Sequence, residues 1–359
     1  MKNYNIYLPS YTVGVDAYHE ISNICLSYGK KIIAIGGNTA IEKSKYSILK
    51  AIEGSDLEIL DFVWYGGDSS YENVELLKNN ILLQEADMIF AIGGGRSVDT
   101  SKVLADQLKK PIFTFPTIAS NCAACTSVCV IYNNEGIFKE LYFPKKPASH
   151  TFINTKIIAE APESFLWAGI GDAISKEFES SFSARNDELE HFNALGIQIA
   201  KMCTKPLVEF GAKALNDCKE NNATYYLEQV ILDIIITTGL VSNLVINDYN
   251  SCLAHSLYYG MTVLKQIEEH HLHGEVVAYG TLVLLTCDKQ YDELSTVYKL
   301  FKSIALPTKL KNLEVSIEEL PLVINKALQT DDIKHVPYEI TYDLIYKSIL
   351  ELEEYNKSH

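Results

Sequence analysis

Residues 88–102, MIFAIGGGRSVDTSK, join a short apolar run to a glycine triplet and then to an amphipathic stretch. A short apolar run bounded by glycine is typical of a buried strand, and the stretch after the triplet has helical periodicity. Further apolar runs at 31–35, 57–65 and 112–115 also end at glycine or proline. This alternation predicts βα units with a parallel sheet, whose carboxyl edge is where ligands bind.

The pattern changes to helical periods from about residue 157, with Leu189, Phe192, Leu195, Ile199 and Met202 recurring at helical spacing. A chain of 359 residues suits two domains. We therefore predict a dinucleotide-binding α/β domain over 1–158 and a helical domain over 159–359. Alternating residues on either side of Asn133-Asn134-Glu135-Gly136 also predict a hairpin within 120–152.

The composition excludes several classes of function. The formal net charge of −15 opposes binding to nucleic acid or to an anionic membrane surface. The longest apolar stretch, 230–246, contains Asp233 and Asn243 and is better explained as a buried helix than as a membrane span. The first residues show no signal-peptide pattern, and eight cysteines in such a chain are expected to be mostly reduced thiols. We expect a cytoplasmic protein.

The glycine triplet after the predicted strand is a candidate phosphate-binding turn. Glycine lets backbone amides approach a phosphate closely, and a helix N-terminus adds a favourable dipole. The run matches neither GxGxxG nor GxxxxGK[ST], so a tight turn that binds nothing is the alternative. The candidate cofactor-binding residues of this run are Gly93, Gly94, Gly95, Arg96, Ser97, Asp99 and Lys102.

Cys122, Cys125 and Cys129 form the pattern CxxCxxxC. An iron–sulfur cluster needs a further thiolate, and no other cysteine is paired nearby in sequence. We favour buried packing for Cys125 and Cys129. A binding or redox-sensing module built around Cys122 and Cys125, without dehydrogenase activity, is a hypothesis of a different class.

One carboxylate and two imidazoles suffice for a catalytic zinc site with an open coordination position. Asp172 lies in a helical stretch, His255 lies in another, and histidines cluster at 270–273. Each also has a structural interpretation: a helix N-cap for Asp172, a core histidine for His255, and a solvated loop for the cluster.

Several segments of the chain occur together in an order found in a known family: GGGRSVDTSK, FPTIASNCAACTSVCVIY, GIGDAISKEFES, AHSLYYGMTVL and HLHGEVVAYG. In this order and spacing the sequence resembles the glycerol dehydrogenase-like branch of the iron-containing alcohol dehydrogenase family. The resemblance implies an N-terminal dinucleotide-binding α/β domain and an all-α C-terminal domain that binds metal and substrate. It implies hydride transfer between a small alcohol, such as glycerol or a related diol, and NAD or NADP. The reverse reaction would reduce a carbonyl substrate.

The resemblance also assigns residues. Asp172, His255 and His273 match the family's metal ligands, for Zn²⁺ or alternatively Fe²⁺, while His270 and His271 do not match them. The positions that contact the nicotinamide cofactor in that branch are here Gly95, Arg96, Asp99, Thr117, Ser120, Thr126, Val128 and Tyr132. We expect a homo-oligomer, a dimer or larger.

The sequence departs from the glycerol dehydrogenase pattern in ways that concern specificity. Arg96 replaces a lysine, Tyr258 replaces a histidine, Cys122 replaces a polyol-contacting aspartate, and Gly37 stands near the place of an acidic residue beside the adenine ribose. The change at Cys122 predicts weak activity on glycerol, and the change at Gly37 predicts use of NADP(H). A 2-oxo acid or hydroxycarboxylate reductase on the same scaffold is the alternative. A dehydroquinate synthase-like lyase would be expected to have Glu where Asp172 stands.

Overall fold

The computed structural model describes residues 4–133 and 136–359, which form two compact units. The α/β unit combines Met1–Glu163 with Asp217–Ile231, and the helical unit combines Ser164–Asn216 with Leu232–His359. A short stretch from the helical half of the chain therefore packs with the α/β unit. The domain limit at 158/159 stays a prediction.

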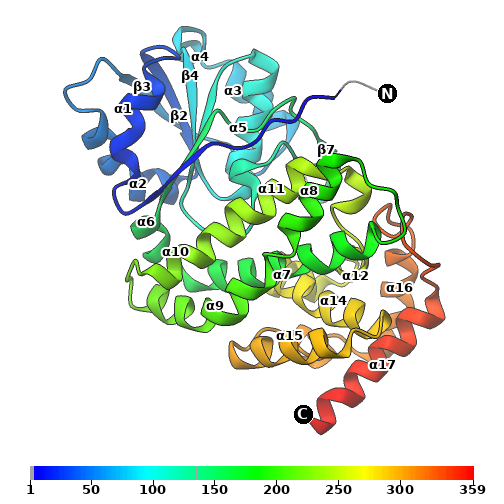
Figure 1. Ribbon diagram of the computed structural model, residues 1–359. Coiled ribbons are helices and arrows are strands. Elements are labelled where there is room, and N and C mark those ends of the chain that lie inside the picture. The colour runs from blue at the N-terminus through cyan, green and yellow to red at the C-terminus, as the bar shows by residue number, and fades with distance from the viewer. Residues whose placement is uncertain (1–3, 134–135) are drawn as a thin grey trace. The chain divides into compact units, whose positions relative to one another are not determined.

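Within the described residues, the α/β unit holds a six-stranded parallel sheet of order β1-β8-β5-β4-β2-β3 (Figure 1). Its strands are β1 (Tyr11–Gly14), β2 (Lys31–Gly36), β3 (Glu58–Trp64), β4 (Met88–Gly93), β5 (Ile112–Pro116) and β8 (His150–Asn154). The four strands expected from the apolar runs are confirmed. The sequence did not indicate β1, which is a short and largely solvent-accessible edge strand, or β8, which begins and ends with polar residues.

Helices cover both faces of this sheet. Side chains from alternate positions of the central strands point to opposite faces, so Ile32 and Phe90 pack on one side and Ile33 and Ile89 on the other. The first face is covered by η1 (Ala17–Glu20), α1 (Ile21–Cys25) and α2 (Asn38–Ile52), and the second by α3 (Tyr71–Lys78), α4 (Ile81–Glu85) and α5 (Gly95–Leu108). This buried, three-layered arrangement explains the almost wholly apolar central strands.

An antiparallel pair follows the last βα unit. Strand β6 (Cys129–Tyr132) pairs with β7 (Phe138–Tyr142), which confirms the expected hairpin. Asn134 and Glu135, in its predicted turn, lie outside the described residues. The short η2 (Ala123–Cys125) precedes the pair, and α6 (Thr155–Ala159) follows β8.

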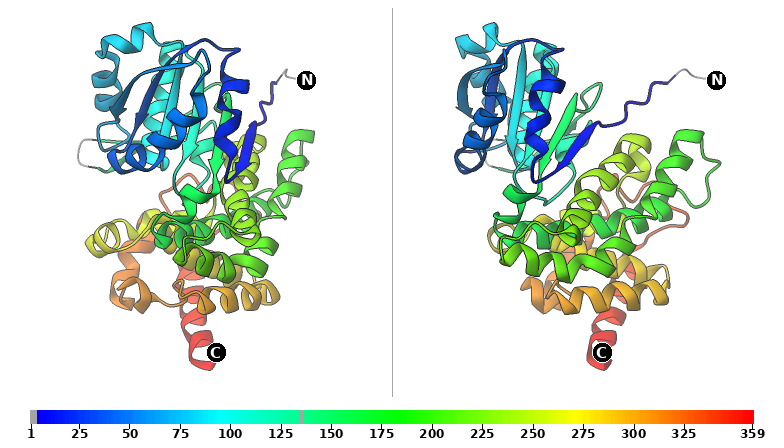
Figure 2. Two further views of the ribbon diagram at one scale, coloured as in Figure 1. Left: turned by 90° about the vertical axis from the view of Figure 1, so that its left-hand side faces the viewer. Right: turned by 60° about the vertical axis from the view of Figure 1, so that its left-hand side comes forward.

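The second half of the described chain is built from helices, as Figure 2 shows in green to red. They are α7 (Glu163–Ser183), α8 (His191–Ala200), α9 (Thr204–Lys219), α10 (Tyr225–Leu232), the π-helical η3 (Asp233–Thr237), α11 (Thr238–Leu244), η4 (Asn247–Tyr249), α12 (Leu253–Met261), α13 (Lys265–His270), α14 (His273–Cys287), α15 (Tyr291–Ser303), η5 (Leu310–Leu313), η6 (Ile317–Glu319), α16 (Leu320–Ala327) and α17 (Tyr342–Ser358). Helix α14 is buried along almost its whole length and packs against α12, α15 and α17.

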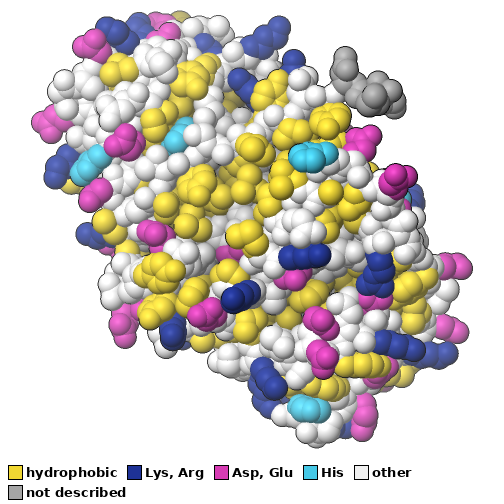
Figure 3. Space-filling model, in the orientation of Figure 1, with side chains coloured by type: hydrophobic (Ala, Val, Ile, Leu, Met, Phe, Trp, Pro, Cys, Tyr) yellow, Lys and Arg dark blue, Asp and Glu magenta, His cyan; other side chains and the backbone are white. Residues whose placement is uncertain are grey.

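One stretch of the described residues, Tyr225–Leu244, is long and apolar enough to cross a membrane by length and composition alone, and 61% of its most apolar window is buried inside the protein. Burial of this kind is typical of a core helix, as expected for 230–246. On the face shown in Figure 3, basic and acidic side chains are intermixed.

Candidate functional site

The glycine triplet lies where β4 ends and α5 begins. Gly93 has a φ of 135°, a conformation that glycine adopts readily and other residues rarely do. Gly94 is the extended N-cap of α5, with no side-chain cap, so the first N–H groups of the helix are not capped by a neighbouring side chain. Ser97 faces inward instead, because its hydroxyl donates to the Ile92 carbonyl at 2.8 Å. These features fit an anion such as a phosphate at the start of α5.

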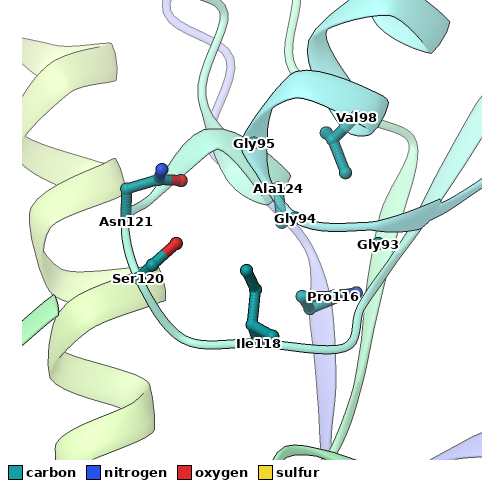
Figure 4. A pocket seen from close by; sticks show the side chains of 9 residues that line it. All are labelled: Gly93, Gly94, Gly95, Val98, Pro116, Ile118, Ser120, Asn121 and Ala124. Carbon is teal, nitrogen blue, oxygen red and sulfur yellow. The ribbon is translucent and has the colours of Figure 1, made fainter. Parts of the chain in front are cut away.

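A small pocket opens on this turn (Figure 4). Its lining consists of Gly93, Gly94, Gly95, Val98, Pro116, Ile118, Ser120, Asn121 and Ala124. A Cβ at Gly94 would lie 2.5 Å from Cδ1 of Ile118, and one at Gly95 would lie 3.0 Å from Nδ2 of Asn121. The loop therefore approaches the turn so closely that side chains at these two positions would displace it. The sequence argument had not indicated Ile118.

Asp99 and Lys102 are buried in the α/β unit and are not among the residues that line this pocket. Lys102 Nζ pairs with Asp99 Oδ1 at 2.9 Å and donates to the carbonyls of Ala123 at 2.8 Å and Val128 at 2.7 Å. Asp99 Oδ2 accepts from the N–H of Val130 at 2.9 Å. Burial alone would lower the pKa of Lys102, but the charge and hydrogen bond of Asp99, together with the nearby Cys129 and Cys122, raise it. The pair holds the loop that forms one wall of the pocket.

The other candidate cofactor residues differ in exposure. The Arg96 side chain is 55% exposed, with Nε 3.5 Å from Asp68 Oδ1 and the guanidinium 4.9 Å from the Tyr132 ring centroid. Thr117 and Thr126 are buried, whereas Ser120 lines the pocket. The structure thus leaves Arg96 the most accessible cation of the glycine-rich segment.

The helical unit brings Asp172, His255 and His273 together from three helices. Their ligand atoms all lie within 4.8 Å of one another, the one such group of metal-binding side chains within residues 4–133 and 136–359. Asp172 Oδ1 is 3.2 Å from His273 Nε2 and 3.6 Å from His255 Nε2. Ligands bound at 2.0–2.2 Å to a tetrahedral zinc ion lie about 3.4 Å apart, so these spacings fit one ion.

Two glycines explain why these helices meet. A Cβ at Gly171 of α7 would lie 2.3 Å from the Gly274 carbonyl oxygen, and one at Gly274 of α14 would lie 2.0 Å from the Ala168 carbonyl oxygen. Backbones can approach so closely only where side chains are absent. Because Asp172 follows Gly171 and His273 precedes Gly274, the same contact places the carboxylate beside the imidazole.

The electrostatics of this group favour a cation. Burial alone would raise the pKa of Asp172, but hydrogen bonds to His255 and His273 and their charge lower it well below its usual range. Burial alone would lower the pKa of His255, but the charge of Glu179 and its hydrogen bonds with the two carboxylates raise it to about 10. Glu179 is itself fully buried, 2.6 Å from His255 Nδ1 through Oε2. A divalent metal would satisfy the same negative field.

The neighbouring histidines lie outside the group, as the resemblance implied. His270 Nδ1 is 2.9 Å from Glu314 Oε2, and His271 Nδ1 is 2.9 Å from Glu275 Oε1. His271 is also largely buried, so that part of the cluster is not a solvated loop. The Tyr258 ring stands edge-on to His273 with ring centroids 4.3 Å apart. Asp172 lies in the middle of α7, so the N-cap interpretation is wrong.

No disulfide joins the cysteines of the described residues. Cys125 and Cys129 are fully buried, which confirms their expected packing role, and Cys122 is partly exposed. Burial raises the pKa of Cys125 well above its usual range, which makes its thiol a poor nucleophile.

One chain thus combines a parallel sheet that has a glycine turn at its carboxyl edge with a helical unit that has a two-histidine, one-aspartate cluster able to hold a metal ion. The family model of iron-containing alcohol dehydrogenases matches residues 9–153. A glycerol dehydrogenase of Thermotoga maritima is 33% identical over 303 residues, which cover 82% of this chain and 81% of that protein. The chain belongs to the iron-containing alcohol dehydrogenase family.

Two other comparisons agree. Hydroxycarboxylate dehydrogenase A of Escherichia coli is 32% identical over 282 residues, which cover 76% of each chain. The crystal structure of a probable glycerol dehydrogenase from Sinorhizobium meliloti 1021 has a TM-score of 0.85 and 26% identity, covering 99% of this chain and 100% of that one. The expected fold class and the glycerol dehydrogenase-like resemblance are confirmed. The protein is an NAD-dependent metal alcohol dehydrogenase, and the redox-module hypothesis is not favoured.

Proposed function

We propose that Asp172, His255 and His273 together bind one catalytic metal ion, Zn²⁺ or alternatively Fe²⁺. The observation that carries this proposal is the spacing of their ligand atoms, which suits a single ion. Alanine at any of these three positions should remove most of the metal, because two remaining ligands lose both affinity and geometry. His271→Ala is the matched control and should retain metal. Elemental analysis of the purified proteins measures this and separates zinc from iron.

We propose that the diphosphate of the cofactor binds at the start of α5. The uncapped helix N-terminus and the absence of side chains at Gly94 and Gly95 support this placement. The residues proposed to contact the cofactor, directly or by shaping its loop, are Gly37, Gly93, Gly94, Gly95, Arg96, Ser97, Asp99, Lys102, Thr117, Ser120, Thr126, Val128 and Tyr132. Arg96 is the most exposed member of this set, and Arg96→Ala should weaken NADH binding without affecting metal content. Fluorescence titration of the variant and of the unmodified protein with NADH tests this.

The chemistry divides between the bound groups and the chain. A metal held by three protein ligands acts as a Lewis acid that lowers the pKa of an alcohol, and a nicotinamide ring accepts the hydride. The protein's own part is orientation and charge. Asp172 would supply the negative charge that holds the cation, and His255 and His273 would bind it through the Nε2 atoms that lie 3.6 Å and 3.2 Å from Asp172 Oδ1. The accessible side of the site is at His273, whose side chain is 39% exposed.

We propose a small alcohol other than glycerol as the preferred substrate, with Cys122 as the substrate-contacting residue. Glycerol dehydrogenases among the relatives make a diol or polyol the starting hypothesis. Cys122 is short, neutral and partly exposed, and it cannot accept a polyol hydroxyl as an aspartate does. A lost hydrogen bond to a charged group costs about 1.5–3 kcal/mol. This corresponds to roughly 10- to 150-fold in kcat/KM.

A panel of glycerol, other 1,2-diols and 2-oxo acids tests this proposal. Cys122→Asp should raise kcat/KM for glycerol, and Cys122→Asn, which has the same shape without the charge, is the control. High activity of the unmodified enzyme on glycerol would refute the proposal. Preference for 2-oxo acids would instead place this chain functionally beside hydroxycarboxylate dehydrogenase A.

We propose that NADP(H) is used at a rate comparable with NAD(H). Gly37 is the N-cap of α2 and has no carboxylate that could bind ribose hydroxyls or repel a 2′-phosphate. Lys43 and Lys45 lie exposed on the same helix, with Lys45 Nζ 4.7 Å from the Phe62 ring centroid. A Cβ at Gly37 would meet only ordinary contacts, the nearest at 3.8 Å, so Gly37→Asp should fold normally. That variant should lose activity with NADP(H) far more than with NAD(H).

We further propose a homo-oligomer located in the cytoplasm. Exposed apolar side chains gather in the N-terminal segment, among them Tyr7 at 41% and Leu8 at 58% exposure, and a second copy could cover them. The lack of disulfides among the described residues suits a reducing compartment. Light scattering should give at least a dimer, and a Tyr7→Ser, Leu8→Ser variant should shift the mass toward the monomer.

A further inference from the structure

Glu179 stands apart among the acidic residues because its carboxylate accepts hydrogen bonds from a neighbouring helix on both oxygens. Oε1 accepts from the N–H of Cys252 at 2.7 Å and of His255 at 3.0 Å. Oε2 lies 2.6 Å from His255 Nδ1. The side chain is 0% exposed, so no solvent competes for these bonds.

The first two bonds place Glu179 at the N-terminus of α12. That helix begins at Leu253, its N-cap Cys252 offers no side-chain cap, and His255 is its third residue. A carboxylate of α7 therefore caps α12 in the place of a local side chain, and the helix dipole adds to its stabilisation. Because two backbone N–H groups fix Oε1, the position of Oε2 is fixed as well.

The third bond sets the orientation of the imidazole. A carboxylate oxygen accepts, so Nδ1 must carry the hydrogen, and once the ring is the neutral imidazole that a metal requires, the lone pair is on Nε2. Nε2 is the atom 3.6 Å from Asp172 Oδ1, on the side where the three ligand atoms converge. Carboxylates that hold the second ring nitrogen of a metal-bound histidine commonly increase metal affinity in this way.

We propose that Glu179 is the positioning residue of the metal site, which presents the Nε2 lone pair of His255 by fixing both the ring and its tautomer. This inference rests on the proposed ligand set of Asp172, His255 and His273. The Glu179 side chain would thus both cap the N-terminus of α12 and orient His255, the third residue of that helix, for binding a cation.

Glu179→Gln separates these two tasks. The amide has a single acceptor oxygen, which can face either the two backbone N–H groups or the ring, but not both. When the oxygen caps the helix, the amide NH₂ faces Nδ1 and favours the tautomer with hydrogen on Nε2, which cannot bind a metal. The variant should therefore keep most of the cap and lose 10- to 100-fold in Zn²⁺ affinity.

Glu177→Gln is the matched control, because Glu177 also lies on α7 and accepts from the N–H of Thr204, the first residue of α9, at 3.2 Å. It touches no proposed ligand. Zn²⁺ dissociation constants are measured by chelator competition, and Tm is measured on the metal-free proteins. We expect the affinity of Glu177→Gln to stay within about twofold of the unmodified protein.

The two hypotheses give different patterns. If Glu179 were only a structural cap, Zn²⁺ affinity would follow Tm across Glu177→Gln, Glu179→Gln and Glu179→Ala. Positioning instead predicts a tenfold or larger loss in Glu179→Gln at nearly unchanged Tm. An affinity of Glu179→Gln within threefold of the unmodified protein overturns the inference. Retention of zinc by Asp172→Ala would instead overturn the ligand set, so the two failures are distinguishable.

Discussion

Alanine at Gly274 should damage the metal site without touching a ligand. The added Cβ would lie 2.0 Å from the carbonyl oxygen of Ala168 and 2.8 Å from its carbonyl carbon. Close carbon–oxygen contacts in proteins lie at about 3.3 Å or more. The two helices must therefore separate by about 1.3 Å, because a backbone carbonyl within a helix cannot rotate away.

The magnitude follows from that separation. Overpacking of a core costs about 1–3 kcal/mol, and a clash with backbone belongs at the upper end of this range. Each kcal/mol lowers Tm by roughly 2–4 °C in a domain of this size. We therefore expect a fall of about 6–12 °C. Asp172 Oδ1 and His273 Nε2, now 3.2 Å apart, would also move beyond the roughly 0.2 Å tolerance of metal–ligand distances.

Thermal unfolding of the metal-free protein and Zn²⁺ competition together test this prediction, with an expected loss of tenfold or more in affinity. Gly211→Ala is the control, since it lies in α9 and its Cβ would meet only Ile170 and Leu300 side chains at 3.5 Å and 3.6 Å. That substitution should be neutral or stabilising by up to about 1 kcal/mol. Unchanged Tm and Zn²⁺ affinity in Gly274→Ala would show that the helices adjust freely and would refute the argument.

Three other substitutions test the α/β unit. Lys102→Met leaves the Asp99 charge buried without its partner, so the free energy of unfolding measured in urea should fall by about 3–5 kcal/mol. The variant should also bind NADH more weakly and retain its Zn²⁺ affinity. Gly94→Val should displace Ile118 and weaken NADH binding in a fluorescence titration, again with normal metal content; unchanged affinity would make the turn purely structural. Burial lowers the pKa of His150 to about 4, so the unfolded state binds more protons below pH 6.5. Stability should thus be highest above pH 6.5 and fall toward pH 4, and His150→Gln should flatten this dependence in thermal unfolding.

The central strands were predictable because their burial is complete, and the edge strand β3 was predictable because its run 57–65 is apolar although it is only half-buried. The strands β2, β4 and β5 are buried on both faces and therefore appear in the sequence as continuous apolar runs. Strand β1 pairs on one side only and is partly open to solvent, so nothing requires an apolar run there. Strand β8 lies between β1 and β5 but contains His150, whose ring nitrogens lie 2.8 Å from the hydroxyls of Ser10 and Thr12. Those partners are distant in sequence and leave no local pattern.

The candidate metal ligands came from a resemblance rather than from spacing, since Asp172, His255 and His273 lie far apart in the chain. What the sequence did not show is the contact that brings them together. Gly171 and Gly274 are each ordinary helical residues in sequence, and only the backbone approach of α7 to α14 explains them. Glu179 was missed for the same reason, because its partners on α12 are more than seventy residues away.

The buried ammonium of Lys102 keeps the backbone of the loop that contains Cys122 in place, so the side chain at position 122 can change while the loop keeps its shape. It holds the loop mainly through backbone carbonyls, those of Ala123, Thr126 and Val128, and so depends little on which side chains the loop carries. Cys122 precedes these anchored carbonyls and is itself partly exposed. With the substrate contact proposed for Cys122, a substitution there should change substrate recognition while the contacts that shape the loop remain. The comparison of Cys122→Asp with Cys122→Asn therefore measures recognition chemistry, and a matched loss of Tm in both variants would contradict this division of roles.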